Sequence, residues 1–529
     1  MNTSAWSPLR QPLFRALWIA AVASNIGTWM QNVGGVWLMT SLTPSPLMVT
    51  LMQTATSLPF FLVALPAGAL ADIIDRRRLL LFWQGWMLAC AAGLGVLTLI
   101  GATTPVVLLS LTFALGLGAA MNAPAWQAIA PELVSRADLP AAVALNSVGF
   151  NIARAVGPAL GGFIVAAAKP AAVFLLNAAS FVGVIFVLYR WRRKRRQTGL
   201  PTERLIGAIR AGMRYVHYAP ALDAVLVRVG VFISCGSALW ALLPLVARQQ
   251  LKLESLGYGV LLGSLGLGAV MGAAFLPKVR QRISIDQLIA IATVVFALAT
   301  LSLAYLHNLA LLCIALVAGG VAWMAIMSSL NVAAQIAVPS WVLSRALGAY
   351  QLVFQGGIAI GSALWGIVAE HLGNSTALLG AASGLIVGLI AAARYQLTPG
   401  DKLDLSPSLH WPEPTVMIDL RPDDGPVLIT SEYYIDPERG RDFAQAMLAL
   451  SRVRRRDGAI RWGLFHDTAN PSRYVETFIV ESWAEHLRQH ERVTVSDRVV
   501  EERALAFHIG QAPPTVSHLI YAYHTGEKE

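Results

Sequence analysis

The stretch Gly-Ala-Leu-Ala-Asp-Ile-Ile-Asp-Arg-Arg-Arg occupies residues 68–78, where a long apolar run ends in a cluster of positive charge. A related stretch, Gly-Ala-Ala-Phe-Leu-Pro-Lys-Val-Arg-Gln-Arg, occupies residues 272–282. At the same spacing, Phe150 matches Phe354 and Gly157 matches Gly361. Internal repeats of this kind are typical of transporters whose two halves rock against each other around a central site. The repeat therefore predicts two related helical halves.

The composition places the chain in a membrane. Hydrophobic residues make up 56% of the 529 residues and charged residues only 13%, and the mean hydropathy is +0.58. A soluble chain of this length needs more charge to cover its surface. Several apolar runs reach the roughly 20 residues that span a bilayer. We therefore predict an all-α polytopic membrane protein whose twelve helices form two six-helix bundles and cover residues 14–40, 47–71, 79–101, 105–130, 139–168, 171–191, 221–247, 256–277, 284–306, 309–337, 342–370 and 375–396.

The distribution of lysine and arginine predicts the orientation in the membrane. The formal net charge is +10, and almost all of the basic residues between the helices fall on one side. That side carries Arg76–Arg78, Arg190–Arg196 and Lys278–Arg282, whereas the other side has only Lys169, Arg248 and Lys252. Because cytoplasmic loops are enriched in positive charge, we predict that both termini are cytoplasmic and that the protein lies in the cell inner membrane. The basic excess is thus a topology signal and does not indicate nucleic-acid binding.

The pattern along the chain predicts five parts. The two bundles occupy 10–191 and 221–396, and a basic cytoplasmic linker with an amphipathic helix joins them over 192–220. A proline-rich linker over 397–425 leads to a soluble α+β domain over 426–529. In this last domain, alternating apolar residues and turn signals predict the order β-α-β-β-α-α-β, which is typical of a small ferredoxin-like fold.

The charged loop after the second predicted helix is a candidate conformational latch formed by Gly68, Asp72, Arg76 and Arg77. A small residue lets a neighbouring helix approach closely, and a carboxylate can cap the positive N-terminal end of another helix. Such a contact can form in one conformation and break in the other. The alternative is that the charges only anchor the loop at the membrane surface.

The fifth predicted helix carries a second motif, formed by Arg154, Gly157, Pro158, Gly161 and Gly162. Gly-Pro followed by Gly-Gly thins and bends a helix, so that a partner in the other half can pack tightly and pivot. A charge within a membrane span is a functional candidate by default. Arg154 could bind an anionic substrate group, pair with a buried acid, or extend its side chain to the interface.

Polar and aromatic residues inside the apolar runs are candidates for the wall of a substrate cavity. Amides and indoles without acids favour a neutral or anionic, amphiphilic solute, although each such residue alone could instead hydrogen-bond a neighbouring helix. We find no carboxylate placed to carry a proton, and the three cysteines lack metal-site spacing, so no cofactor or metal is expected. The candidates are Asn25, Trp29, Gln31, Asn122, Trp126, Gln127, Asn331, Gln335, Tyr350 and Gln355.

These motifs resemble those of the major facilitator superfamily. The 68–78 loop is similar to the signature loop that joins its helices 2 and 3, but Ile73 and Asp75 depart from the usual basic residue and glycine. The string from Asn151 to Gly162 is similar to the helix-5 motif of the superfamily's antiporters. Residues 10–400 resemble the branch that contains the enterobactin exporter and macrolide efflux proteins, the transmembrane secretion effector type. The resemblance implies proton-coupled export of a small molecule by alternating access, with import by the same fold as the rival.

The soluble domain resembles the dimeric α/β-barrel domains of small cofactorless antibiotic-biosynthesis monooxygenases. That resemblance implies a homodimer formed through this domain, in a dimerising or regulatory role. It also leaves open an exporter fused to an enzyme, in which His466, Trp462 and Trp483 would line a small pocket. We expect a transporter and not an enzyme.

Overall fold

The computed structural model describes residues 6–127, 129, 133–135, 138–191, 214, 215, 218–339, 341–397, 404–412, 414 and 416–521, apart from the side chains of residues 65, 69, 71–73, 140, 391 and 392. It divides into two compact units. Unit 1 comprises Met1–Leu200, Leu226–Asn331 and Tyr350–Gln396, and unit 2 comprises Pro201–Val225, Val332–Ala349 and Leu397–Glu529. Most of the basic linker predicted over 192–220 lies outside the described residues.

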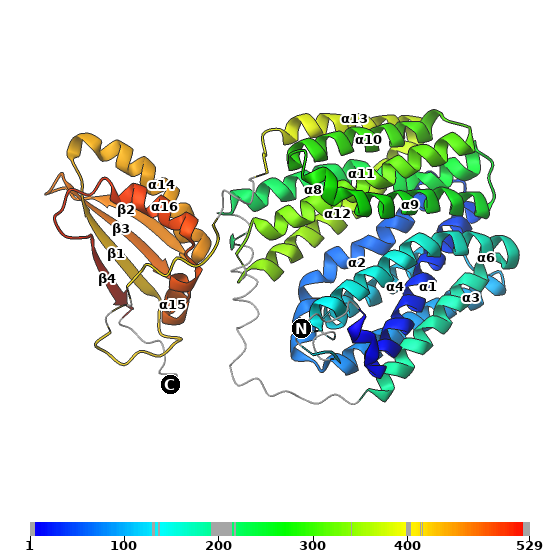
Figure 1. Cartoon of the computed structure of the whole chain (residues 1–529), viewed down its shortest axis with the longest axis horizontal. Helices are drawn as coiled ribbons and strands as arrows, with labels where there is room; N and C mark the ends of the chain where they lie inside the picture. The colour runs from blue at the N-terminus through cyan, green and yellow to red at the C-terminus, as the bar shows by residue number, and fades with distance from the viewer. Residues whose placement is uncertain are drawn as a thin grey trace. The chain divides into compact units, whose positions relative to one another are not determined.

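The first bundle begins with a short 3-10 helix, η1 (Ser7–Arg10), and contains α1 (Pro12–Leu42), α2 (Pro46–Ile73), α3 (Arg76–Leu99), α4 (Pro105–Gln127) and α6 (Leu139–Arg190). Figure 1 shows these helices together in blue to teal. Three of them start at a proline, which suits the first helical turn because the amide it lacks has no partner there. Asp75, where the resemblance leads one to expect glycine, is the N-cap of α3 and accepts a hydrogen bond from the Arg78 amide at 3.1 Å.

Helix α6 contains the fifth and sixth predicted helices. A straight helix of its 52 residues would be about 78 Å long, far more than a membrane core of about 30 Å. Lys169 interrupts it with a φ of 69° and a ψ of 163°, immediately before Pro170. The break falls where the sequence predicts the two helices to separate.

The second bundle contains α8 (Pro220–Leu245) with the π-helical turn η2 (Val246–Gln250), then α9 (Ser255–Arg280), α10 (Ile285–Tyr305), α11 (Leu309–Ile336), α12 (Leu343–Leu372) and α13 (Asn374–Ala392). It is drawn in green to yellow in Figure 1. Among the described residues, nine helices are long and apolar enough to cross a membrane. Twelve spans result only if α6 counts as two and α1 and α13 are included, so the predicted count is confirmed in part.

The C-terminal part of unit 2 is a four-stranded antiparallel sheet with helices packed on it. The strands are β1 (Val427–Tyr434), β2 (Arg461–His466), β3 (Arg473–Val480) and β4 (Thr515–Ile520), in the order β2-β3-β1-β4. The helices are the short η4 (Pro437–Arg439), α14 (Gly440–Asp457), α15 (Trp483–Arg492) and α16 (Val495–Leu505). Alternate residues of β1 are buried: Tyr433 packs with α14 and α16, and Val427 and Ile429 pack with Trp483 at the start of α15. The predicted element order is confirmed, and the strand order is that of a ferredoxin-like sheet.

Candidate substrate cavity

A cavity of about 770 Å³ lies within unit 1 and is lined by residues of both bundles. Its first-bundle wall comes mainly from α1, α2 and α6, and its second-bundle wall from α8, α9, α11 and α12. A volume of this size suits a drug-sized solute. The lining mixes aromatic and thioether side chains with amides and hydroxyls.

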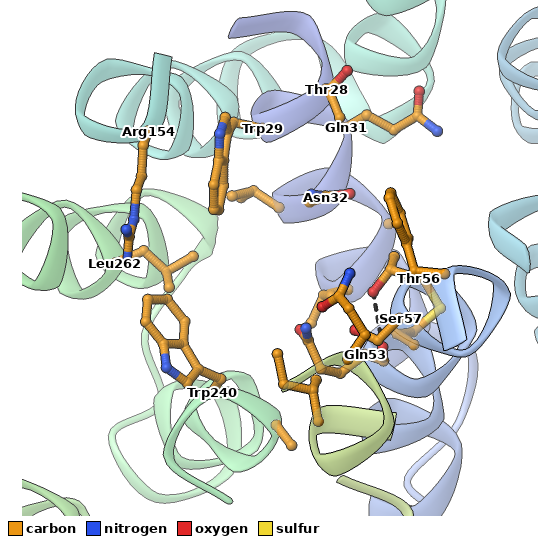
Figure 2. Close-up of a pocket in the computed structure, with 18 of the residues that line it drawn as sticks. Thr28, Trp29, Gln31, Asn32, Gln53, Thr56, Ser57, Arg154, Trp240 and Leu262 are labelled. Atoms are coloured by element: carbon orange, nitrogen blue, oxygen red, sulfur yellow. Dashed lines mark hydrogen bonds between the residues drawn. The ribbon is translucent and has the colours of Figure 1, made fainter. Parts of the chain in front are cut away.

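Arg154 of α6 is the only charged residue among the described residues that line the cavity. Its guanidinium carbon lies 6.0 Å from the ring centroid of Trp240 on α8. Figure 2 shows Trp29 of α1 beside Arg154, with Trp240 and Leu262 on the same side of the cavity. Within the described part of the chain, no hydrogen bond or ion pair neutralises this guanidinium. The structure therefore favours a cavity-facing Arg154 over one paired with a buried acid.

The wall opposite Arg154 is polar and comes from α2. Gln53, Thr56 and Ser57 are labelled there in Figure 2, and the Thr56 hydroxyl donates to the Gln53 carbonyl at 2.8 Å. These three residues are not among the cavity candidates predicted from the sequence. Their spacing of three and four positions places them on one face of a helix, and that spacing is the signal by which they could have been found.

The second bundle adds an aromatic wall. Trp323 of α11 lies 6.4 Å from Phe354 of α12, centroid to centroid, and Phe354 stacks on Tyr350 at 6.5 Å. Met324 and Met327 line the cavity beside them. Flat rings and flexible thioethers adapt to many apolar shapes, which favours an amphiphilic solute.

Six of the ten predicted cavity candidates line the cavity, namely Asn25, Trp29, Gln31, Asn331, Tyr350 and Gln355. Gln31 also accepts a hydrogen bond from the Asn177 side chain at 2.6 Å, so its amide fixes α1 against α6.

The other four candidates do not line this cavity. Helix α4 contributes Thr112, whereas Asn122 lies ten residues farther on, about 15 Å along the axis, and accepts from the Gln84 amide at 3.4 Å. Trp126 packs on an apolar cluster of α1, α3 and α6, Gln127 is exposed, and so is Gln335. Polarity alone does not give the depth of a residue along a helix.

The glycines of the helix-5 motif permit close helix contacts. A Cβ at Gly157 would lie 2.5 Å from Trp29 Cβ, and one at Gly161 would lie 2.8 Å from Met30 Cα, so both pack on α1 of the same bundle. A Cβ at Gly162 would lie 2.7 Å from the Ser255 carbonyl oxygen and 3.1 Å from Gly259 Cα on α9 of the other bundle. Of these three glycines, only Gly162 therefore makes the predicted close contact with the other bundle.

Most of the polar contacts between described residues of the two bundles lie at one end of unit 1. The Glu370 carboxylate of α12 accepts from the Ser45 hydroxyl at 2.7 Å and from the Leu47 amide at 3.1 Å, at the start of α2. Arg248 of η2 donates to the Thr40 hydroxyl at 2.9 Å. This end contains the α1–α2 and α8–α9 connections, which carry little positive charge.

The predicted latch is only partly within the described residues. The Asp72 side chain lies outside them. Arg77 donates to the Leu188 carbonyl at 2.9 Å and to the Tyr189 carbonyl at 2.6 Å, so it caps the last turn of α6 in its own bundle. Arg76 lies at the start of α3. A Cβ at Gly68 would meet no described atom within 4 Å, so none of the described residues makes the close helix approach expected there.

The three residues suggested for an enzymatic pocket do not form one. His466 is exposed at the end of β2, stacks on Tyr474 and hydrogen-bonds the Pro471 carbonyl at 2.8 Å. Trp483 packs into the apolar core of the sheet, and Trp462 is half-buried against the same core, where its ring N–H donates to Glu476 at 2.9 Å. The described residues contain no cluster of three or more histidine, cysteine or acidic side chains able to hold a metal ion.

Comparison with known proteins agrees with this geometry. A family model described as transmembrane secretion effector matches residues 3–525. The enterobactin exporter EntS of Escherichia coli O1:K1 is 26% identical over 421 residues, covering 75% of this chain and 98% of its own. The multidrug efflux pump Tap of Mycolicibacterium fortuitum is 25% identical and covers 72% of this chain and 95% of its own.

Solved structures show the same fold at low identity. A single-residue mutant of the nucleoside transporter NupG superposes with a TM-score of 0.60 at 14% identity, covering 72% of this chain and 99% of its own. A bacterial homologue of the lysosomal transporter Spinster, in an inward-facing and unoccupied conformation, superposes with a TM-score of 0.56 at 14% identity, covering 73% and 96%.

Proposed function

Because this chain belongs to the transmembrane secretion effector family, and is thus a multi-pass membrane transporter of the major facilitator type, we propose that it exports small amphiphilic organic anions. The substrate class covers siderophores, drugs and other metabolites that combine a flat apolar body with a negative group. Transport proceeds by alternating access of the cavity. The proposed direction rests on two similar proteins, an enterobactin exporter and a multidrug efflux pump.

The observation that carries the proposed substrate class is Arg154 in the cavity wall, which forms no ion pair with any described residue. A guanidinium held away from bulk water without an acid is costly, and an anionic solute would remove that cost. Trp29 and Trp240 beside it offer flat faces for an aromatic or apolar body. The amides and hydroxyls of α2 would satisfy polar groups at the other end of the solute.

The contacts between the bundles support an inward-facing arrangement. They gather at the end that carries Arg248 and Glu370, and the scarcity of basic residues there favours the periplasmic side. We propose that this end is closed while the cavity takes up solute from the cytoplasm. Both termini, and the soluble domain, then lie in the cytoplasm, with the chain in the cell inner membrane. A periplasmic reporter fused after Glu529 should be inactive, and an active reporter would overturn the orientation.

We also propose coupling to the proton gradient and pairing of two chains through the soluble domain. The described lining of the cavity contains no carboxylate, so a coupling proton would bind elsewhere in the chain. Comparing efflux with and without a proton ionophore tests the coupling. Measuring the mass of the detergent-solubilised chain, with and without residues 397–529, tests the pairing.

The direct test of the function uses a deletion strain and labelled solute. Cells that express the chain should accumulate less of a fluorescent aromatic anion than cells without it. Everted membrane vesicles, whose cytoplasmic face is outside, should take the same anion up. Accumulation by intact cells would favour the rival importer, and equal transport of a neutral isostere would refute the role given to Arg154.

A further inference from the structure

A second cavity, of about 600 Å³, lies within unit 2 and is lined by arginines and aromatic rings. One wall is formed by Arg214 and Tyr218, immediately before α8. The other wall is the turn from α14 into β2, together with Glu481 after β3. No residue of this cavity lines the membrane cavity.

The α14–β2 wall carries an excess of positive charge that the described residues do not neutralise. Arg455 lies in the last turn of α14 and Arg461 is the first residue of β2. Neither forms an ion pair within the described part of the chain, whereas the neighbouring Arg454 and Arg456 are paired with acids. Glu481 is the only carboxylate among the described lining residues. Two guanidiniums that face one cavity are a common arrangement for binding a carboxylate or phosphate.

An indole fixed in orientation stands beside these arginines. The Trp462 ring N–H donates to the Glu476 carboxylate at 2.9 Å, and Glu476 is fully buried. The hydrogen bond uses the polar edge of the indole, so the ring can offer an apolar surface to the cavity. Tyr218 lines the same cavity with a second ring. Flat ligands stack on such rings.

The wall before α8 is held firmly to the rest of unit 2. Arg214 pairs with Glu485 at 3.2 Å. Tyr215 is 2% exposed and lies under the Arg456 guanidinium at 5.4 Å, and Arg456 itself pairs with Asp457 and Asp497. A ligand in the cavity would therefore touch both the soluble domain and the segment that continues into a membrane helix.

We propose that this cavity binds a small organic anion that carries a flat ring, at a site separate from the transport pathway. The anionic group lies between Arg455 and Arg461, and the ring lies against Trp462. The site goes beyond the proposed transport function and does not depend on it.

The test measures equilibrium binding of 2-naphthoate to the full chain in nanodiscs of neutral phosphatidylcholine. Every protein carries Arg154→Gln, which removes the charge of the membrane cavity. Saturable binding is expected, and the neutral isostere 2-naphthylmethanol should bind at least ten times more weakly. Replacing Arg455 and Arg461 by glutamine should weaken 2-naphthoate binding by about 10- to 100-fold, as expected for lost charge-assisted hydrogen bonds.

Arg452→Gln is the matched control, because Arg452 is exposed on the same helix and does not line the cavity; it should leave the affinity unchanged. If the double variant binds 2-naphthoate as tightly as the protein that keeps Arg455 and Arg461, the proposal is overturned. Inorganic phosphate binding as tightly as 2-naphthoate would overturn the role of the ring. Loss of binding in phosphatidylglycerol nanodiscs would assign the arginines to lipid headgroups and also overturn it. Failed export by the chain with its native Arg154, together with intact binding in the Arg154→Gln protein, would refute the transport proposal alone.

Discussion

The contact between Gly162 of α6 and Gly259 of α9 predicts that a single methyl group shifts the transport cycle. A Cβ at Gly162 would lie 2.7 Å from a backbone oxygen, and one at Gly259 would lie 3.1 Å from the Pro158 carbonyl oxygen. Backbone atoms cannot turn away as a flexible side chain can, so Gly162→Ala must push the two helices apart. Overpacking of this kind costs about 1–3 kcal/mol. The conformation with α6 and α9 in contact should lose about 5- to 150-fold in population relative to the alternative.

The assay measures how fast a maleimide alkylates a cysteine introduced at Thr40, in detergent and in a chain whose three natural cysteines are replaced by alanine. Thr40 is 9% exposed and lies where the two bundles touch, and its hydroxyl accepts a hydrogen bond from Arg248 at 2.9 Å. Gly162→Ala should raise the alkylation rate and lower transport. Gly259→Ala should act in the same direction but more weakly, because its overlap is smaller.

Gly263→Ala is the matched control, one turn farther along α9. A Cβ there would meet no described atom within 4 Å, and alanine favours a helix over glycine by about 1 kcal/mol. It should leave both the alkylation rate and transport unchanged. If Gly162→Ala and Gly263→Ala behave alike in both assays, the contact does not control the cycle and the reasoning is wrong.

Three further predictions concern single groups. Arg154→Gln should weaken transport of an aromatic anion by about 10- to 150-fold and spare a neutral analogue, with transport measured per amount of protein. Arg154→Lys should retain part of the transport activity, because the charge is kept. Equal losses for both solutes would point to a conformational role of Arg154. Asp72→Asn should cut transport while membrane abundance stays normal if Asp72 is a latch, and transport near wild type would leave it as an anchor. Burial, together with the nearby His518 and His490, lowers the pKa of His486 to about 3, so the unfolded chain binds a proton below pH 6.5 that the folded chain does not. The contribution of neutral His486 to the free energy of unfolding is therefore fully present above pH 6.5, and the free energy should fall by about 2–3 kcal/mol by pH 4.5. Thermal unfolding of the full chain should show this loss in wild type and less of it in His486→Leu. An equal loss in both proteins would contradict the assignment to His486.

The sequence was sufficient to predict most elements because local patterns end sharply. Lys169-Pro170 breaks a long apolar run, and the structure places a non-helical residue at Lys169. In the soluble domain, strand and helix periods differ and turns separate them, so the order of elements could be predicted. The strand order needs contacts that no local pattern contains, and it followed only from the general type of fold.

The residues that line the cavity could be predicted in part, and the differences between the predicted and the observed lining have a physical cause. Arg154 and Trp29 were found because a charge or an indole is conspicuous in an apolar helix. Gln53 and Thr56 were missed because a hydroxyl or amide on a membrane helix also satisfies its own backbone, as Thr56 does. Asn122 was misplaced because the direction of a side chain follows from the helical period, whereas its depth depends on how the helix is set against its neighbours.

Arg154 is the one charged residue in the described lining of the cavity, and it has an electrical consequence for the proposed export. With a monovalent anion bound beside Arg154, the site is neutral, and its passage from the cytoplasmic to the outer side moves no net charge. The empty site returns carrying its guanidinium, and an interior-negative voltage pulls that charge back toward the cytoplasm. One charge across 100 mV corresponds to about 2.3 kcal/mol. The resting voltage would thus reset the empty carrier after each release, and export of a monovalent anion should be recorded as an inward current.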